Sequence, residues 1–139
     1  MTNFEPPVRL KYDYFTDDAG RPRGVAKMAG EGPTWLSGYM SLPDRSGTER
    51  LVAAYMKIKP PIEGYECGLC VWNEKTANFE HLRTVWKKTE ATPKHPPMPQ
   101  GNPVIIDGDD GKKWALFGNP LPTLRCPATF EGSDRARTR

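Results

Sequence analysis

The sequence predicts an all-β fold built from antiparallel hairpins, and three observations support this prediction. The 139 residues include 15 prolines and 13 glycines, and these breakers interrupt every candidate helical stripe. Short runs of strand-forming residues alternate with turns rich in Asp and Gly, which suit hairpins. Several runs are apolar on both alternating faces, as strands in stacked sheets are. The hairpins are therefore expected to form partial propeller blades or a small sandwich.

Four strand pairs are expected in order along the chain, and each pair is joined by a turn that holds Asp, Asn or Gly. The pairs are 11–15 with 24–28, 35–42 with 50–58, 65–72 with 79–86, and 104–107 with 113–117. Between the last two pairs, residues 93–99 contain four prolines. Proline cannot donate to a strand ladder, so this segment is expected to be a stiff connection across the surface.

The faces of the strands indicate what must cover them. In residues 51–56 both alternating sets are apolar, so both faces of that strand are expected to be buried. Residues 35–42 and 104–106 repeat this pattern. A single sheet with one face in water would not need it, whereas sheets stacked face to face would.

Length and charge predict one β-rich domain over residues 1–131 and a disordered basic tail over residues 132–139. The 20 basic and 17 acidic residues are interspersed, with a net charge of only +3. No apolar run is long enough for a membrane span, and no signal-peptide core follows Met1. Three cysteines, an odd number, favour free thiols in a reducing compartment, so a cytoplasmic location is expected.

Short motifs in the strand region resemble segments of five-bladed β-propellers. The motifs are WLSG at 35–38, ERLVA at 49–53, YECG at 65–68, FGNP at 117–120 and RCPATFE at 125–131. The similar propellers are those of arabinanase- and invertase-like glycosidases and their uncharacterised relatives. The hairpins amount to about two blades, whereas closed propellers need four or more. The resemblance therefore implies a propeller fragment, of the kind that mobile gene cassettes carry.

An open fragment of a propeller would expose an apolar blade face and an unpaired strand edge. Self-association covers both, because one patch can bury its own copy about a two-fold axis. The expected partner is therefore a second copy, in a homodimer or higher oligomer. The alternative is a monomer in which the proline-rich segment and the termini cover the exposed face.

The resemblance also implies chemistry, because these glycosidases use a pair of carboxylates. Glu66 and Glu131 are the candidates for such a pair. In invertase-like enzymes a carboxylate precedes the Cys-Pro pair, but here Arg125 precedes Cys126. The main expectation is therefore a non-catalytic module that binds a carbohydrate or another small molecule. A glycosidase-like hydrolase is one alternative, and a module that docks on a protein partner through an exposed blade face is another.

Aromatic and charged side chains on the predicted strands are the candidates for ligand binding. Indoles that flank a groove often hold sugars and other flat ligands, although core packing explains the same residues. The candidates are Trp35, Tyr65, Glu66, Trp72, Trp114 and Arg125. Nucleic-acid binding is not expected, because no glycine-aromatic signature of the single-strand-binding folds is present.

Two motifs suggest metals but fit them poorly. Cys67 and Cys70 have the spacing of a zinc knuckle, yet residues three apart on a strand point to opposite faces. Residues 107–111 are rich in Asp and Gly like a calcium loop, but no glutamate closes that loop. No metal or other cofactor is expected.

Overall fold

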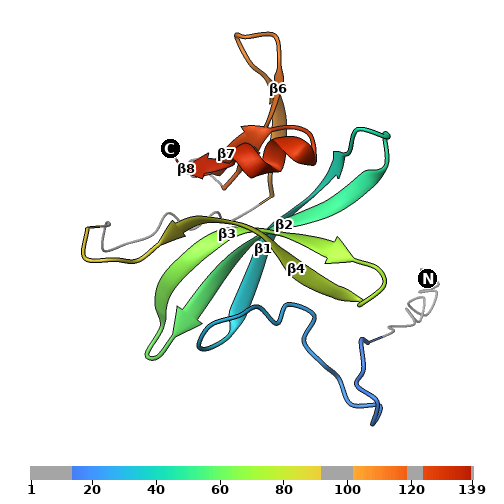
Figure 1. Cartoon of the computed structure of the whole chain (residues 1–139), viewed down its shortest axis with the longest axis vertical. Coiled ribbons are helices and arrows are strands. Elements are labelled where there is room, and N and C mark those ends of the chain that lie inside the picture. The colour runs from blue at the N-terminus through green and yellow to red at the C-terminus, as the bar shows by residue number, and fades with distance from the viewer. Residues whose placement is uncertain (1–13, 92–101, 119–123, 139) are drawn as a thin grey trace, which may run out of the picture.

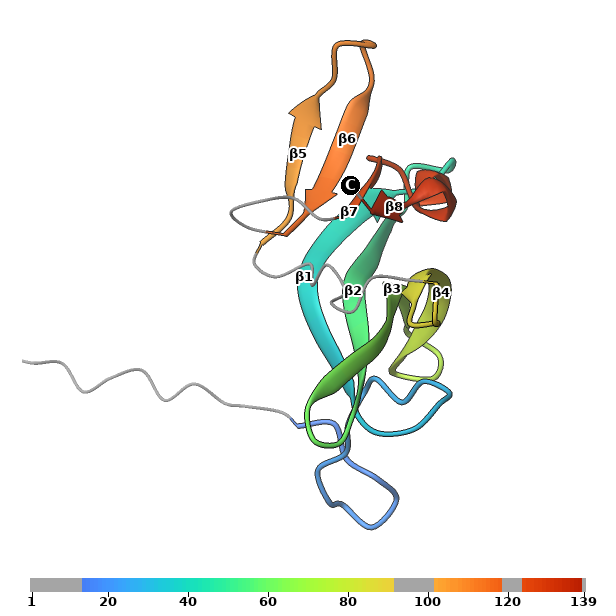
Figure 2. The same ribbon diagram turned by 90° about the vertical axis from the view of Figure 1, so that its left-hand side faces the viewer.

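The computed structural model describes residues 14–91, 102–118 and 124–138, and its architecture is mostly antiparallel β. The all-β prediction is confirmed. The strands form two four-stranded sheets, in the orders β1-β2-β3-β4 and β5-β6-β7-β8 (Figures 1 and 2). The predicted proline-rich connection, 93–99, lies outside the described residues.

The first sheet holds the long strands, and the second sheet holds short ones with a single-turn 3-10 helix, η1. The first sheet consists of β1 (Thr34–Pro43), β2 (Glu49–Lys59), β3 (Glu63–Asn73) and β4 (Asn78–Lys87). The second consists of β5 (Val104–Asp107), β6 (Lys113–Phe117), β7 (Leu124–Pro127) and β8 (Arg137–Thr138), and η1 (Glu131–Arg135) lies between β7 and β8.

The turn between β1 and β2 shows how the sequence sets a hairpin. The Asp44 side chain accepts hydrogen bonds from the backbone N–H groups of Ser46 (2.9 Å) and Thr48 (3.0 Å). Gly47 supplies the positive φ of 83° that closes the turn. The register of β1 on β2 follows from this turn, with Pro43 opposite Glu49.

Strand β2 is buried on both faces, as its sequence predicts. Val52 and Ala54 lie in the cluster between the two sheets. Ala53 and Tyr55 face the other side, where Val25 from the N-terminal segment packs on them. One face is thus covered by a sheet and the other by an irregular segment.

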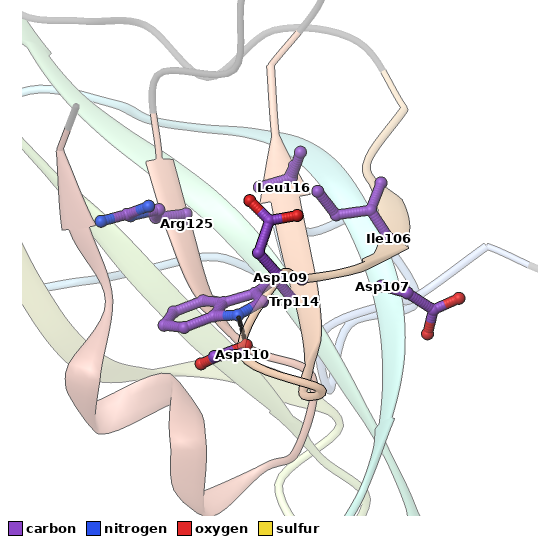
Figure 3. Close-up of a pocket in the computed structure, with 8 residues that line it drawn as sticks. Ile106, Asp107, Asp109, Asp110, Trp114, Leu116 and Arg125 are labelled. Carbon is purple, nitrogen blue, oxygen red and sulfur yellow. Dashed lines mark hydrogen bonds between the residues drawn. The ribbon is translucent and has the colours of Figure 1, made fainter.

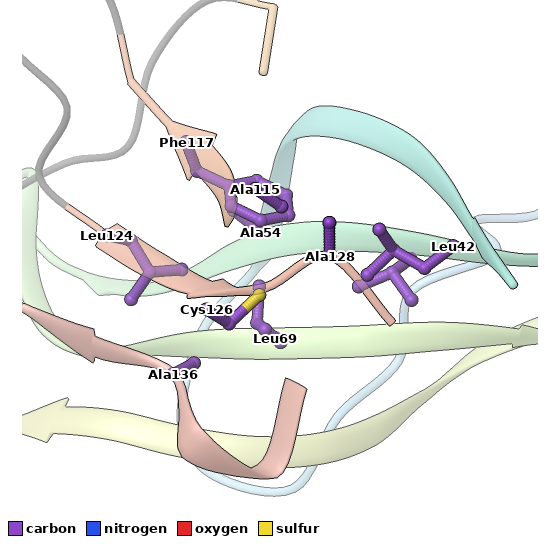
Figure 4. Packing of buried hydrophobic residues seen from close by; sticks show 10 residues of the cluster. Leu42, Ala54, Leu69, Ala115, Phe117, Leu124, Cys126, Ala128 and Ala136 are labelled. Carbon is purple, nitrogen blue, oxygen red and sulfur yellow. The ribbon is translucent and has the colours of Figure 1, made fainter. Parts of the chain in front are cut away.

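The second sheet packs on the first through one face only. Its buried side chains form a single cluster with those of the first sheet (Figure 4). The members of the cluster are Leu42, Val52, Ala54, Leu69, Ala115, Phe117, Leu124, Cys126, Ala128 and Ala136. Most of the members from the second sheet are small, so its backbone can lie close to the first sheet.

Two strands are more exposed than their sequences predict. Val104, Ile105 and Ile106 of β5 are 53%, 47% and 43% exposed. The reason is that β5 is an edge strand, in a hairpin that projects beyond the first sheet (Figure 2). Trp35 and Tyr39 are exposed because β1 is likewise an edge strand.

The predicted strand pair 11–15 with 24–28 is wrong in its described part. Residues 14–28 contain only one isolated bridge, between Thr16 and Pro22. The segment instead crosses the first sheet, where the N–H of Phe79 donates to the Val25 carbonyl (2.6 Å). Burial of its apolar side chains on that sheet replaces the pairing of two short strands.

The expectation of a disordered tail from residue 132 onward also needs correction. Residues 131–135 form η1, and residues 137–138 pair with β7. Gly132, Ser133 and Ala136 are buried, and the Ser133 hydroxyl donates to the Phe130 carbonyl (2.5 Å). Regular structure therefore continues past residue 131.

Gly68 provides a test of this packing. It lies on β3 at an irregularity in the pairing with β4, and a Cβ there would lie 1.9 Å from the Arg83 carbonyl oxygen. We expect Gly68→Ala to lower the free energy of unfolding by about 3 kcal/mol or more, because backbone must move. Gly24→Ala is the control, since a Cβ at Gly24 meets nothing within 4 Å. Equal stabilities of the two variants in urea denaturation would contradict the β3–β4 geometry.

Candidate functional site

The outer face of the second sheet carries the strongest candidate site. In the register of β5, β6 and β7, Ile106 pairs with Trp114, Trp114 pairs with Pro127, and Leu116 pairs with Arg125. Directly paired residues share a face of a sheet. The alternate residues of β6 and β7 are buried against the first sheet, so this set faces outward. We call these five residues, with Asp110, Lys112 and Arg135 beside them, the Trp114 site.

The Trp114 indole is held in place from three directions. Its Nε1 donates a hydrogen bond to Asp110 Oδ1 (3.2 Å), as Figure 3 shows. The Arg125 guanidinium lies over the ring, 5.3 Å from the ring centroid. A Cβ on Gly108 would lie 2.7 Å from the indole, so only glycine lets the turn approach this closely. The indole is thus fixed before any ligand arrives.

Two hollows adjoin the indole and share Trp114 and Arg125. The first, about 390 Å³, is lined by Ile106, Leu116 and the acidic turn 107–110. The second, about 280 Å³, is lined by Lys112, Pro127 and Arg135. Hollows of this size suit a small molecule or one group of a larger ligand.

The two hollows differ in charge. The indole hydrogen bond is the main reason that the pKa of Asp110 lies below its ordinary value, so this carboxylate stays ionised. Lys112 Nζ lies 3.9 Å from Asp110, at the border of the two hollows. Asp107 pairs with Lys113 (3.0 Å), and its carboxylate points away from the indole in Figure 3. Acidic residues therefore outnumber the one cation, Arg125, in the lining of the first hollow, whereas the charged residues that line the second are all cations.

The structure brings Trp114 and Arg125 together, but it separates the other predicted ligand residues from them. Trp72 packs between Phe15 and Phe79, with ring centroids 5.4 and 5.3 Å away. Trp35 is exposed on β1, away from this sheet. These two indoles belong to the first sheet and its covering segment.

Tyr65 and Glu66 lie near the turn between β2 and β3. The Tyr65 hydroxyl donates to the Glu31 carbonyl (2.8 Å). A hollow of about 500 Å³ beside it is lined by Lys59, Lys88 and Glu90 among others. Lys88 is paired with Glu63 and Lys59 lies 3.7 Å from the same carboxylate, so these ammonium groups already have a partner. This hollow is a weaker candidate than the Trp114 site.

Glu66 and Glu131 do not form a catalytic pair. Glu66 lies opposite Lys57, near the end of β2, where it accepts a hydrogen bond from Tyr55 (2.9 Å). Glu131 accepts a hydrogen bond from the N–H of Arg45 (3.0 Å), just before β2 begins. At about 3.3 Å per residue, β2 separates these two places by roughly 26 Å, whereas a glycosidase pair needs about 5–10 Å.

Sequence reasoning missed two polar features of the first sheet. The fully buried Lys57 ammonium donates to the Gly32 carbonyl (2.8 Å) and to Met28 O and Thr34 Oγ1 at longer range. A chain of hydrogen bonds also links His81 to Thr84 and Thr84 to Tyr55. Burial raises the pKa of Tyr55, so its hydroxyl stays protonated. No spacing in the sequence marks these residues, because strand register brings them together.

Lys112, Arg135, Ile106 and Leu116 of the Trp114 site were also missed. The signal for two of them is present in the sequence: alternation in a hairpin centred on residues 108–111 places Ile106 and Leu116 on the face of Trp114. Arg135 has no such signal, since η1 brings it there.

Among the described residues, no group of three or more His, Cys, Asp or Glu side chains is arranged to hold a metal ion. Over the same ranges, no helix has the length and apolar character needed to cross a membrane. Comparison of the chain with family models, curated proteins and solved structures gives no match. The propeller resemblance therefore stays a prediction that rests on its motifs.

The cysteines offer a test of the zinc and redox alternatives. All three side chains are buried, and burial raises the pKa of the Cys67 thiol to about 11 and those of the Cys70 and Cys126 thiols to about 12. We expect no native thiol to react with a disulfide reagent within minutes at pH 8, because the thiolate is the reactive form. The chain unfolded in guanidinium should react at all three thiols, as the control. One rapidly labelled thiol in the native protein would contradict this assignment.

Proposed function

We propose that the chain is a non-catalytic module that binds a small molecule at the Trp114 site. The observation that carries the proposal is the fixed indole of Trp114, placed between two hollows of opposite charge. A site that is ordered in advance loses little entropy when a ligand binds. A carbohydrate is one ligand that suits an indole platform.

A binding role is favoured over hydrolysis by the positions of the acids. The acidic residues of the turn beside Trp114 are all exposed. Asp107 pairs with Lys113, and Asp110 pairs with Lys112 and accepts the hydrogen bond of the indole. An acid catalyst needs a carboxyl whose pKa is raised by burial, and the pKa of Asp110 is lowered. The three buried thiols favour a reducing compartment, and we infer a cytoplasmic location from them.

Binding at this site can be tested with four ring compounds: glucose, glucuronate, adenosine and adenosine monophosphate. We expect at least one to shift the indole N–H resonance of Trp114 in NMR titrations. Trp114→Ala should weaken that binding roughly tenfold or more, since stacking on an aromatic ring is worth about 1–3 kcal/mol. Trp35→Ala is the matched control, because that indole is exposed on another sheet. Unchanged affinity in Trp114→Ala would overturn the proposal.

A second proposal concerns the partner, and the exposed edge strand β5 favours it. We propose that two copies associate by antiparallel pairing of their β5 strands. Val104, Ile105 and Ile106 would then leave water, and the unpaired backbone groups of the edge would gain partners. In the described residues β5 pairs with β6 alone.

Symmetry selects the register of this pairing. The N–H of Gly108 donates to the Lys112 carbonyl (2.8 Å), so alternate residues toward β5, Ile106 and Val104, also bond to β6. The N–H and C=O groups of Ile105 and Asp107 therefore point to the free edge. A two-fold axis at Ile105 gives two hydrogen bonds between the two Ile105 residues and sets Val104 against Ile106 of the partner.

The proposal of self-association predicts a dimer whose population rises with concentration in light scattering behind a sizing column. Ile105→Lys should shift the equilibrium to monomer, because a charge at the centre of an edge opposes pairing. Ile62→Lys, at an exposed turn of the first sheet, should leave the dimer unchanged. A wild-type chain that stays monomeric at every concentration would refute this interface.

A further inference from the structure

We propose that the ligand of the Trp114 site carries an oxyanion, either a carboxylate or a phosphate, on a ring that contacts the indole. This inference rests on the proposed function and specifies its chemistry. It follows from three properties of the site: the charge of the second hollow, the guanidinium donors that have no acceptor among the described residues, and the apolar surface beside them.

All the charged residues that line the second hollow are cations. Lys112, Arg125 and Arg135 line it together with Trp114 and Pro127, and no acidic residue is among its lining residues. The closest carboxylate to these cations is that of Asp110, 3.9 Å from Lys112 Nζ. Like charges gathered in one place repel each other, so a bound anion would relieve an unfavourable arrangement.

The guanidinium N–H groups of the two arginines have no acceptor among the described residues. Arg125 contacts the Trp114 ring, but neither Arg125 nor Arg135 forms an ion pair or a side-chain hydrogen bond with the described part of the chain. By contrast, Arg23 uses its guanidinium on the carbonyls of Thr16, Gly24 and Ala77. A free planar guanidinium presents paired N–H groups that match the two oxygens of a carboxylate or phosphate.

The inference that the ligand contains a ring comes from the apolar surface next to the three cations. Trp114, Pro127 and Leu116 are half-buried neighbours on the same face, and Ile106 extends it toward β5. An inorganic anion would leave this surface in water, whereas a ring attached to the anion would cover it. The small size of the hollows favours a free small molecule over a polymer.

The test compares neutral and anionic members of matched pairs: glucose with glucuronate, and adenosine with adenosine monophosphate. We expect glucuronate, adenosine monophosphate or both to bind at least tenfold more tightly than the neutral member. Inorganic phosphate alone should bind more weakly than the anionic rings. The relative affinities of glucuronate and adenosine monophosphate then show whether the site prefers a carboxylate or a phosphate.

Variants of the arginines test whether the second hollow is the place where the anion binds. Arg135→Gln should weaken binding of the anionic ring about fivefold to tenfold and change binding of the neutral ring less. Arg125→Gln should weaken binding of both rings, and of the anionic ring more, because its guanidinium also lies over the Trp114 ring. Higher salt concentration should weaken binding of the anionic ring but not of the neutral ring, because salt screens interactions between exposed charges. Arg21→Gln removes an equal charge at an arginine that pairs with Asp17, and it should change nothing.

The outcomes separate the two proposals. If a neutral ring shifts the Trp114 resonance as strongly as its anionic partner does, the site binds ligands but the oxyanion inference is wrong. If inorganic phosphate binds as tightly as the anionic rings, the inference that the ligand contains a ring is wrong. If a short single-stranded oligonucleotide binds more than tenfold more tightly than adenosine monophosphate, the inference that the ligand is a small molecule is wrong. If no probe shifts the resonance, the proposed function and this inference both fail.

Discussion

Burial of β2 on both faces is the constraint on which the rest of the structure depends. Residues 52–58 are all buried, so each face of the first sheet needs its own cover. The second sheet supplies one cover, and the segment that contains Val25 and Met28 supplies the other. The two covers are independent because they touch opposite faces. This explains how an irregular segment can replace a third sheet: it needs only a few apolar side chains and backbone bonds such as that between Phe79 and Val25.

The same constraint leaves one face of the second sheet free. Ala115, Cys126 and Ala128 are small enough for that sheet to lie close to the first, and Phe117 packs in the same cluster. The fully buried apolar side chains of the second sheet are therefore on its inner face. The outer face carries Trp114 and Arg125, which contact each other in place of a covering layer. A large aromatic residue on such a face contributes little to the core, which is why we assign it to binding.

The sequence was sufficient for the positions of β1 to β6 and for the two buried faces of β2, because alternation and turn residues are local signals. The hairpin turns at Asp44 and at residues 108–111 were predicted where they lie. The failures share a physical cause. Residues 104–106 have an apolar pattern, but whether a strand is central or at an edge depends on partners that the pattern does not name. The tail was misjudged because its small residues, Gly132, Ser133 and Ala136, fit between elements that only the tertiary fold assembles. Of the site, Trp114 and Arg125 were found by residue type, while their contact follows from the register of β6 and β7.

The proposed edge pairing and the proposed binding site are linked by geometry. A two-fold axis that relates two antiparallel edge strands must stand perpendicular to the sheet, so the outer faces of both copies end on the same side. Ile106 of one copy would then lie beside Val104 of the other, and the apolar floor of the first hollow would continue into the partner. The two Trp114 residues would be separated by three strand spacings of about 4.8 Å across the sheet and by two residues along it, which is about 16 Å in total. Two sites on one continuous face at this distance would bind a ligand with two anionic rings more tightly than either site alone, since the second contact becomes intramolecular. The exposed edge strand β5, which could aggregate in a single chain, would in this way enlarge the binding surface of the dimer.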